Sequence, residues 1–261
     1  MSGQRGSILI SGAGRGIGRA TAQLFLSRGW RVGLYDVDVD ADAAADAAGS
    51  SPAAVHGVLD VRDPDQWRAV LRDFCGDGGL DVLVNNAGVL ASGPFVAIDG
   101  EAHRRMVDVN VSGIINGAAA GHAHLQRARR GLLLNLCSAS ALYGQPSLAT
   151  YGATKAAAKS LTEALDIEWR GDGVRVRSLL PLFVATEMVS RDGRSATSVA
   201  RLGVRLTAGD VAAAAWRVVH ERRRWLRSPH RPVGAQTRVL AAASAVTPDW
   251  ANRLVVRRIA G

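Results

Sequence analysis

The feature that most constrains the fold is the regular alternation of short apolar runs with longer helix-like stretches through residues 7–180. Several of the runs are rich in Val and Leu, as expected of strands buried on both faces of a sheet. The predicted strands are Ser7–Ser11, Arg31–Tyr35, Ala54–Leu59, Leu80–Asn85, Leu132–Leu136 and Arg175–Leu180. The predicted helices are Ile17–Ser27, Ala41–Ala48, Pro64–Phe74, Gly100–Arg129 and Tyr151–Trp169. Because alternating strands and helices form right-handed βαβ units, the sequence predicts an α/β fold with a doubly wound parallel sheet.

Beyond Pro181 the alternation ends. Residues 182–207 are polar, and Thr207-x-x-Asp210 has the N-cap signature of a following helix. The prolines of Ser228–Pro232 predict a break, and two short helices are expected after it, Ala235–Ala245 and Pro248–Arg258. No repeat or linker marks a second domain, so residues 1–261 are predicted to form one domain, with 228–261 as a helical, basic C-terminal extension.

The net charge of +9 is unevenly distributed, because residues 217–261 hold ten arginines and only two acids. Such a tail can bind nucleic acid or an anionic membrane surface, or form a solvated face or a subunit contact. No nucleic-acid-binding motif accompanies it, so no nucleic acid is expected as a partner. A membrane-surface contact is the less favoured alternative, since the sequence defines no wide apolar face in the tail.

The cysteines and the N-terminus predict a reduced, cytoplasmic protein. Cys75 and Cys137 stand 62 residues apart, outside any disulfide or ligand-spaced motif, and no metal site is expected. The N-terminus has no signal-peptide pattern, and no window of about 18 residues is apolar enough to span a membrane.

A glycine-rich segment, Ser11-Gly12-Ala13-Gly14-Arg15-Gly16-Ile17-Gly18, follows the first predicted strand and opens a helix. Glycines allow a pyrophosphate to approach the backbone, and the free N–H groups at a helix N-terminus bind anions. Ile17 excludes the common G-x-G-x-x-G spacing, and the spacing present is Gly12-x-x-x-Gly16-x-Gly18. This segment predicts a dinucleotide phosphate site.

Asp36 ends the second strand, 18 residues after Gly18. A carboxylate there is placed to accept hydrogen bonds from the adenosine ribose, and it would repel a 2′-phosphate. Arg15 favours the opposite cofactor, because a cation in the phosphate loop favours NADP. We give Asp36 more weight and predict NAD over NADP.

Tyr151 and Lys155 share one face of a predicted helix at i and i+4. A phenol has a pKa near 10, about three units too high for a base at neutral pH. A neighbouring ammonium lowers that pKa. Lys155 is one of only two lysines beside 30 arginines, which indicates that a compact ammonium is required at this position.

In order and spacing, these motifs resemble the short-chain dehydrogenase/reductase family in its single-domain Rossmann branch, over residues 7–186. Ser11–Gly18 resembles the nucleotide loop, and Asp60-Val61 resembles the pair whose carboxylate meets the adenine. Asn85-Asn86-Ala87-Gly88 is similar to the element after the fourth strand. Asn110 and Ser138 fall on the active-site asparagine and serine, which completes a tetrad with Tyr151 and Lys155.

The resemblance implies an NAD(P)-dependent oxidoreductase that interconverts a secondary alcohol and a ketone. Ser138 would orient the substrate oxygen, Tyr151 would act as general acid or base, and Lys155 would lower the pKa of the tyrosine and contact the nicotinamide ribose. Asn110 would position a water. The implied cofactor-binding residues are Gly12, Gly14, Arg15, Gly16, Ile17, Gly18, Asp36, Asp60, Val61, Asn86, Ala87, Gly88, Tyr151, Lys155, Pro181, Val184 and Thr186.

The departures from the family pattern lie in the C-terminal part of the chain, after residue 181. Leu182 replaces a glycine expected beside the nicotinamide, and Arg231–Gly234 is a poor remnant of the usual last strand. Residues 182–207 are the expected substrate lid. The expected lining is apolar and favours a hydrophobic substrate over a sugar: Ala139, Ala141, Leu142, Tyr143, Leu148, Leu182, Phe183 and Met188.

Two alternatives stay open, an NADP-dependent carbonyl reductase and a non-catalytic NAD-binding regulator. A homodimer or homotetramer is expected, built on the helices Gly100–Arg129 and Tyr151–Trp169. The second of these helices is rich in small residues, Ala153, Ala156, Ala157, Ala158 and Ala164.

Overall fold

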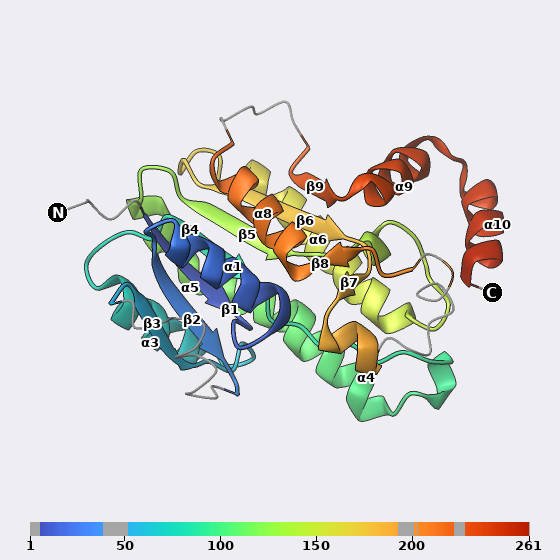
Figure 1. Cartoon of the computed structure of the whole chain (residues 1–261), viewed down its shortest axis with the longest axis horizontal. Coiled ribbons are helices and arrows are strands. Elements are labelled where there is room, and N and C mark those ends of the chain that lie inside the picture. The colour runs from blue at the N-terminus through green and yellow to red at the C-terminus, as the bar shows by residue number, and fades with distance from the viewer. Residues whose placement is uncertain (1–5, 39–51, 193–200, 202, 222–227, 261) are drawn as a thin grey trace.

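Seven parallel strands form one sheet in the order β3-β2-β1-β4-β5-β6-β9 (Figure 1). The computed structural model describes residues 6–38, 52–192, 201, 203–221 and 228–260, so the predicted helix Ala41–Ala48 lies outside the described residues. The strands are β1 Ser7–Ser11, β2 Arg31–Asp36, β3 Ala54–Val58, β4 Val82–Asn85, β5 Leu132–Leu136, β6 Arg175–Pro181 and β9 His230–Val233. The predicted doubly wound α/β fold is confirmed. Strand order reverses between β1 and β4, and in open parallel sheets ligands bind beside the carboxyl ends of the strands at such a point.

Helices cover both faces of the sheet. One face carries α1 (Gly16–Ser27) and α8 (Ala208–Val219), and the other carries α3 (Pro64–Cys75), α5 (Gly113–Arg127) and α6 (Ala149–Glu168). Successive residues of β1 serve the two cores in turn, because side chains alternate across a strand. Ile8 and Ile10 pack in the core of α1 and α8, whereas Leu9 packs with Trp67 of α3.

The predicted continuous helix Gly100–Arg129 is interrupted. It consists of α4 (Gly100–Val107), a π-helical turn (Asp108–Ser112) and α5. No proline marks this interruption, so the apolar pattern of the sequence did not disclose it. π turns of this kind are frequent at functional sites, and this one contains Asn110.

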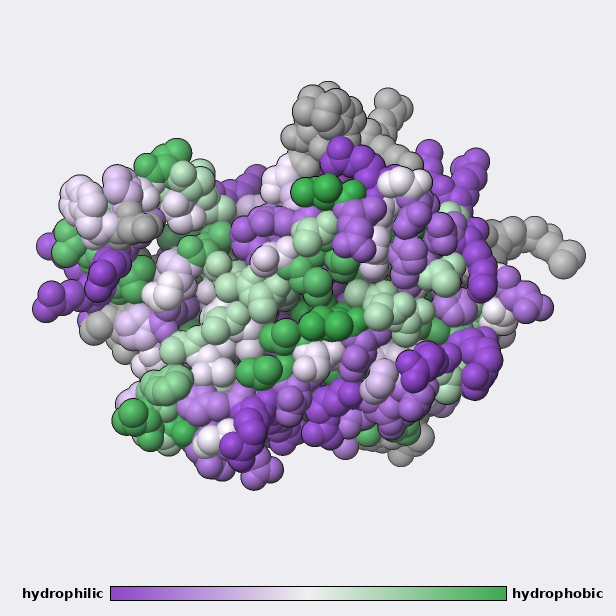
Figure 2. All heavy atoms as spheres, turned by 180° about the vertical axis from the view of Figure 1, so that it is seen from behind, coloured by the Kyte–Doolittle hydropathy of each residue, from purple (hydrophilic) through white to green (hydrophobic). Residues whose placement is uncertain are grey.

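The outward side of α6 is lined by small residues. Ala153, Ala156 and Ala164 are exposed, whereas Ala158 is buried against the protein's own core. Ile167 of α6 and Ile115 of α5 are also exposed, at 69% and 47%. Figure 2 shows a hydrophobic band across the middle of the face that lies behind the sheet in Figure 1.

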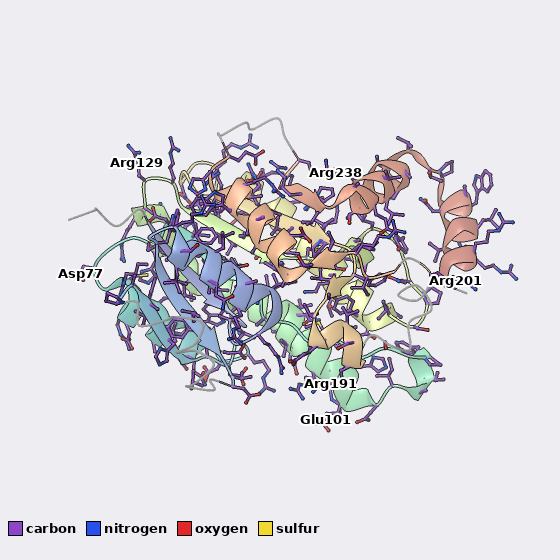
Figure 3. The ribbon with its side chains drawn as sticks, in the orientation of Figure 1. Asp77, Glu101, Arg129, Arg191, Arg201 and Arg238 are labelled. Carbon is purple, nitrogen blue, oxygen red and sulfur yellow. The ribbon has the colours of Figure 1, made fainter. Side chains whose placement is uncertain are left out.

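Beyond the sheet, β7 (Val184–Ala185) and β8 (Leu206–Thr207) pair with each other, and α8 begins with the predicted capping box of Thr207. The chain ends in α9 (Ala235–Val246) and α10 (Asp249–Ala260), with α10 at the edge of the molecule. Figure 3 shows Arg201 beside α10 and Arg129 at the opposite end. Among the described residues, no helix has both the length and the apolar character needed to cross a bilayer.

The segment Ser228–Pro232, predicted as a break, instead contains the last strand of the sheet. β9 pairs with β6 through residues 178–181, so the reading of Arg231–Gly234 as a poor strand remnant was wrong. Pro232 is tolerated because β9 is an edge strand, and a proline there need not donate to a neighbour.

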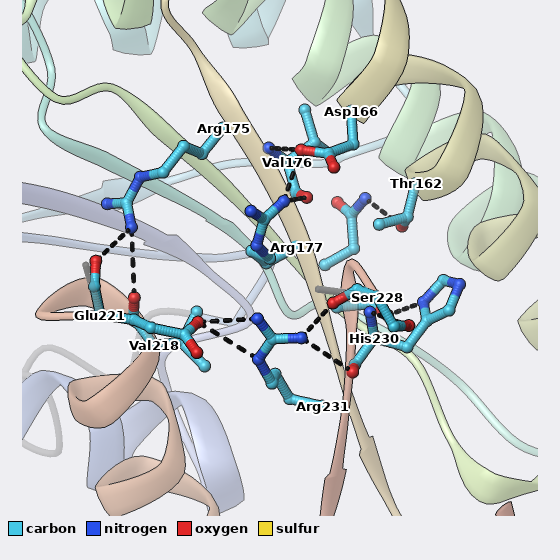
Figure 4. A network of polar contacts seen from close by, with 12 residues as sticks. Thr162, Asp166, Arg175, Val176, Arg177, Val218, Glu221, Ser228, His230 and Arg231 are labelled. Atoms are coloured by element: carbon cyan, nitrogen blue, oxygen red, sulfur yellow. Dashed lines mark hydrogen bonds and ion pairs between the residues drawn. The ribbon is translucent and has the colours of Figure 1, made fainter. Parts of the chain in front are cut away.

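Hydrogen bonds and an ion pair satisfy the polar side chains of this strand (Figure 4). His230 bonds the Ser178 hydroxyl through Nδ1 and the Glu163 carboxylate through Nε2, each at 2.7 Å. Arg231 forms an ion pair with Glu221 at 2.8 Å. These contacts hold β9 against β6, α6 and the end of α8.

Candidate active site

The glycine-rich turn between β1 and α1 packs directly against the segment that follows β4. Gly12 has φ +66°, and a Cβ there would lie 2.7 Å from the Cα of Ala87. A Cβ at Gly18 would lie 2.2 Å from the Gly12 carbonyl oxygen and 2.6 Å from Nδ2 of Asn86. Both positions therefore require glycine, and the turn can bring its backbone close to a phosphate.

Ser11 and Asn86 fasten the two segments together at this switch point. The Ser11 hydroxyl accepts hydrogen bonds from the N–H groups of Asn86 and Ala87, both at 3.2 Å. The Asn86 side-chain amide donates to the carbonyl oxygens of Ser11 and Gly12 at 2.9 and 2.8 Å. The side chain of Asn86 thus holds the glycine turn in place through two of its carbonyl oxygens.

Asp36 lies at the end of β2, next to the same turn. Its Oδ2 accepts a hydrogen bond from Gly14 N–H at 2.9 Å, and its Oδ1 accepts one from Val37 N–H at 2.8 Å. Arg15 forms an exposed ion pair with Glu187 at 3.7 Å. The carboxylate therefore stands beside the phosphate loop, where the sequence predicts a ribose contact.

Asp60 follows β3 and is bound by its own neighbour. The Arg62 guanidinium donates to both carboxylate oxygens, with its shortest contact at 2.6 Å, and lowers the pKa of Asp60. The Val61 carbonyl accepts hydrogen bonds from Trp67 Nε1 and Asn116 Nδ2, both at 3.1 Å. An adenine contact by Asp60 stays a prediction, and it would have to share the carboxylate with Arg62.

The segment after β6 leads back to the glycine turn. A Cβ at Gly16 would lie 3.4 Å from Cγ2 of Thr186, which places Thr186 against the phosphate loop. Pro181 ends β6, and Val184 begins β7 and is buried. Leu182, which replaces the expected glycine, is 8% exposed and packs in an apolar cluster with Phe183, Ala139, Leu148, Leu90, Leu142, Tyr151 and Leu240.

Tyr151, Ser138 and Lys155 come together between α6 and the end of β5. Burial raises the pKa of Tyr151 to about 12, opposed by a hydrogen bond with Ser138. The Lys155 ammonium lies 5.7 Å from the centre of the Tyr151 ring and donates to the Leu136 carbonyl at 3.0 Å. Burial lowers the pKa of Lys155. In the protein alone, burial therefore outweighs the expected effect of Lys155 on the phenol.

Asn110 links the loop after β4 to α6. It is fully buried; its Oδ1 accepts from Val89 N–H at 2.8 Å, and its Nδ2 donates to the Val89 carbonyl at 2.9 Å and to Thr154 Oγ1 at 3.1 Å. A Cβ at Gly88 would lie 3.3 Å from Asn110 Oδ1 and 3.6 Å from Lys155 Nζ. Gly88, Asn110 and Lys155 therefore converge.

Three further residues belong to this region but carried no sequence signal. Thr154 accepts the bond from Asn110 and donates to the Tyr151 carbonyl at 2.7 Å, which ties the π turn to the helix of the tyrosine. Glu187 pairs with Arg15. Leu240 comes from α9, so the C-terminal extension contributes to the apolar cluster around Tyr151.

The arrangement fits a dinucleotide laid across the carboxyl ends of β1 and β4. The glycine turn would hold the pyrophosphate, Asp36 would meet the adenosine ribose, and Lys155 would meet the nicotinamide ribose. The nicotinamide end would then reach Tyr151 and Ser138. No group of three or more metal-ligating side chains occurs among the residues described.

Known proteins share both the sequence pattern and the fold. The short chain dehydrogenase family matches residues 7–196. The 3-alpha-(or 20-beta)-hydroxysteroid dehydrogenase of Mycobacterium tuberculosis is 35% identical over 181 residues, 69% of either chain.

Two solved structures are similar over most of their length. A 3-ketoacyl-(acyl-carrier-protein) reductase of Brucella melitensis, complexed with NADH, is 28% identical with a TM-score of 0.80, covering 90% of this chain and 99% of its own. A gluconate 5-dehydrogenase of Burkholderia cenocepacia, in complex with NADP and tartrate, is 26% identical with a TM-score of 0.78, covering 90% and 96%. With the matched motifs and fold together, this chain belongs to the short-chain dehydrogenase family of NAD(P)-dependent oxidoreductases.

Proposed function

We propose that this protein is an NAD(H)-dependent dehydrogenase that interconverts an apolar secondary alcohol and its ketone. The observation that carries the proposal is the convergence of Tyr151, Ser138 and Lys155 at the carboxyl end of β5. A panel of secondary alcohols and ketones, followed by NADH absorbance, tests it. Failure of every member of a broad panel would count against turnover and favour the alternative of a non-catalytic cofactor-binding regulator.

The residues have distinct parts in the reaction. A nicotinamide cofactor held at this site would supply the hydride in reduction and accept it in oxidation. Tyr151 donates its hydroxyl proton to the carbonyl oxygen as the alcohol forms, and takes that proton back in the reverse direction. Ser138 donates a hydrogen bond to the same oxygen and stabilises the charge that develops on it. Asn110 holds the loop after β4 against α6 through Val89 and Thr154.

The electrostatics of the protein alone favour the protonated phenol. A pKa of about 12 keeps Tyr151 protonated at neutral pH, which is the form needed for reduction. The Lys155 ammonium on the same helix favours the phenolate, which is the form needed for oxidation. Lys155 therefore limits the cost of removing a proton from a buried phenol.

The apolar cluster around Tyr151 supports a hydrophobic substrate. Leu148, Leu182 and Phe183 are buried beside the tyrosine, and Leu240 packs against them from α9. A polyol would leave its hydroxyl groups without partners against these side chains, at a cost of about 1–3 kcal/mol for each buried group. A hydrophobic alcohol or ketone meets no such penalty.

We expect NAD to bind more tightly than NADP, and Asp36→Ala to weaken NAD binding while relaxing the preference. A 2′-phosphate beside Asp36 would meet a carboxylate, whereas two ribose hydroxyls would donate to it. Titration of NADH and NADPH onto the wild type and the variant, followed by nicotinamide fluorescence, measures both effects. Tighter NADPH binding to the wild type would instead support the alternative of an NADP-dependent carbonyl reductase.

Asp36 also bonds Gly14, so loss of loop structure must be separated from loss of ribose recognition. Asp36→Asn is the matched variant, because its amide oxygen can still accept from Gly14 while its charge is gone. Asp36→Asn should bind NADPH more tightly than the wild type does, while the structure of the glycine loop is retained. Arg15→Gln tests the opposing cation, and we expect only a small change because Arg15 is exposed and paired with Glu187.

We expect a homodimer formed across the outward side of α6. Ala153, Ala156 and Ala164 are exposed there beside Ile167, and small side chains allow two helices to approach closely. Light scattering should give about twice the chain mass of 27.4 kDa. Ala156→Glu should shift the protein to monomer, because it places a charge between the helices. Gln23→Glu on α1 is the charge-matched control, and a monomeric wild type would end this expectation.

A further inference from the structure

The outward side of α9 is apolar although it faces solvent. Its inward side carries Thr237, which is 1% exposed, and Leu240, which packs against the cluster around Tyr151. On the opposite side of the helix, Val239 and Val246 are 69% and 82% exposed. Ala242 and Ala243, which lie between these two valines in the sequence, are also exposed. Arg238 is the one charged residue of α9.

Helix α10 adds an aromatic and basic face. Trp250 and Leu254 stand one turn apart and are 68% and 57% exposed. At about 100° per residue, Arg253 and Arg257 flank this pair on one side and Arg258 flanks it on the other. All three arginines are exposed. The helix therefore presents an indole and a leucine between cations.

Exposed apolar side chains and positive charge thus occur together at one end of the molecule. Of the large hydrophobic side chains that are exposed in the described part of the chain, four lie within the 16 residues from Val239 to Leu254. Residues 228–261 hold five arginines and one acid, Asp249. We propose that the outward sides of α9 and α10 bind the surface of an anionic phospholipid bilayer.

The chemistry favours this occupant over others. Tryptophan rests at the headgroup level of a bilayer, and arginines beside it reach the lipid phosphates. A nucleic acid would satisfy Arg253, Arg257 and Arg258 but offers no apolar phase for Val239 and Val246. A second copy of this chain would bring like charges of two α10 helices together.

The position of α9 connects this surface with the active site. Leu240 contacts the apolar cluster that contains Tyr151, and the exposed valines lie on the other side of the same helix. A bilayer bound by α9 would therefore lie one helix diameter from the cluster. This link to an apolar substrate rests on the proposed function, whereas lipid binding itself does not.

Co-sedimentation of the full-length protein with vesicles tests the proposal. Vesicles of phosphatidylcholine mixed with phosphatidylglycerol should carry the protein down at low salt, and pure phosphatidylcholine should not. Trp250→Ala combined with Leu254→Ser should abolish binding. Arg253→Gln, Arg257→Gln and Arg258→Gln combined should weaken it roughly 100-fold, at about fivefold for each arginine.

The control removes the same charge elsewhere. Arg72, Arg129 and Arg130 are exposed, and Figure 3 shows Arg129 at the end of the molecule opposite α10. Their combined replacement with Gln should leave vesicle binding almost unchanged. Equal weakening in this control, or no binding to anionic vesicles, would overturn the proposal. The proposal would also be overturned if the wild type did not bind vesicles and the Trp250→Ala, Leu254→Ser variant had a lower molar mass than the wild type in light scattering. That result would mean that a second copy of the chain covers this surface.

NADH binding and the thermal midpoint show whether each variant is folded. If the protein were an active dehydrogenase but did not bind vesicles, only the proposed lipid-binding surface would be rejected. Vesicle binding by a protein that turns over no alcohol or ketone would reject the proposed function alone.

Discussion

Tyr151→Phe is expected to reduce kcat by about 100- to 10,000-fold, the range that a positioned general acid or base contributes. The substitution removes the hydroxyl and keeps the ring, so the packing against Leu148 and Leu182 is retained. NADH should therefore bind the variant with nearly unchanged affinity. The measurement is steady-state turnover of the best substrate of the panel, beside a fluorescence titration of NADH.

Tyr35→Phe is the matched control, because Tyr35 is also a buried tyrosine but lies on β2 in the core with Trp67. It should retain turnover. If Tyr151→Phe kept more than about a tenth of wild-type kcat, the general acid or base would have to be another group.

Asp166→Ala is expected to lower the free energy of unfolding by about 3–5 kcal/mol. Arg177 is on the central part of β6 with only 7% of its side chain exposed, and its guanidinium pairs with Asp166 of α6. Asp166 also accepts a hydrogen bond from the Val176 N–H at 3.2 Å. Removing the carboxylate leaves a buried cation that keeps its hydrogen bond to the Val176 carbonyl at 2.8 Å (Figure 4). Chemical unfolding monitored by circular dichroism measures the loss.

Two further variants separate burial of charge from the mere loss of an ion pair. Asp73→Ala breaks a pair with Arg72 whose side chains are 72% and 73% exposed, and it should cost less than about 1 kcal/mol. Arg177→Met added to Asp166→Leu should recover much of the lost stability, because an apolar pair leaves no buried charge. A cost of Asp166→Ala no larger than that of Asp73→Ala would contradict the expectation.

Most of the sheet could be predicted because its strands are apolar on both faces, but β9 could not. Pro229 and Pro232 flank two polar residues, a composition typical of a turn. The strand forms because its needs are met from distant elements. His230 is bonded by Ser178 and Glu163, and Arg231 is paired with Glu221. These partners lie 10 to 67 residues away in the chain and leave no local pattern.

The site residues were predicted from a succession of short motifs, and their roles stay predictions. Their placement follows from the topology, because carboxyl ends of parallel strands meet at one edge of the sheet. Contacts between residues of different motifs could not be predicted from the sequence. Arg62 engages Asp60 because of the local path of the chain after β3, and Thr154 meets Asn110 only because α6 packs against the π turn.

The π turn at Asp108–Ser112 also shows where this helix can change in length. A π turn holds one residue more than the α-helical turn it replaces, so it absorbs that residue without changing the phase between α4 and α5. Deleting one residue within the turn would therefore leave a regular helix with α5 still in register with the sheet. A deletion within the regular part of α5, ahead of Gly117, would instead rotate the residues after it by about 100°. Gly117, whose absent Cβ would lie 2.2 Å from Asn85 Oδ1, would then be replaced at its close contact by a side chain. Evolution can therefore add or remove a single codon at the π turn at much lower cost than in α5.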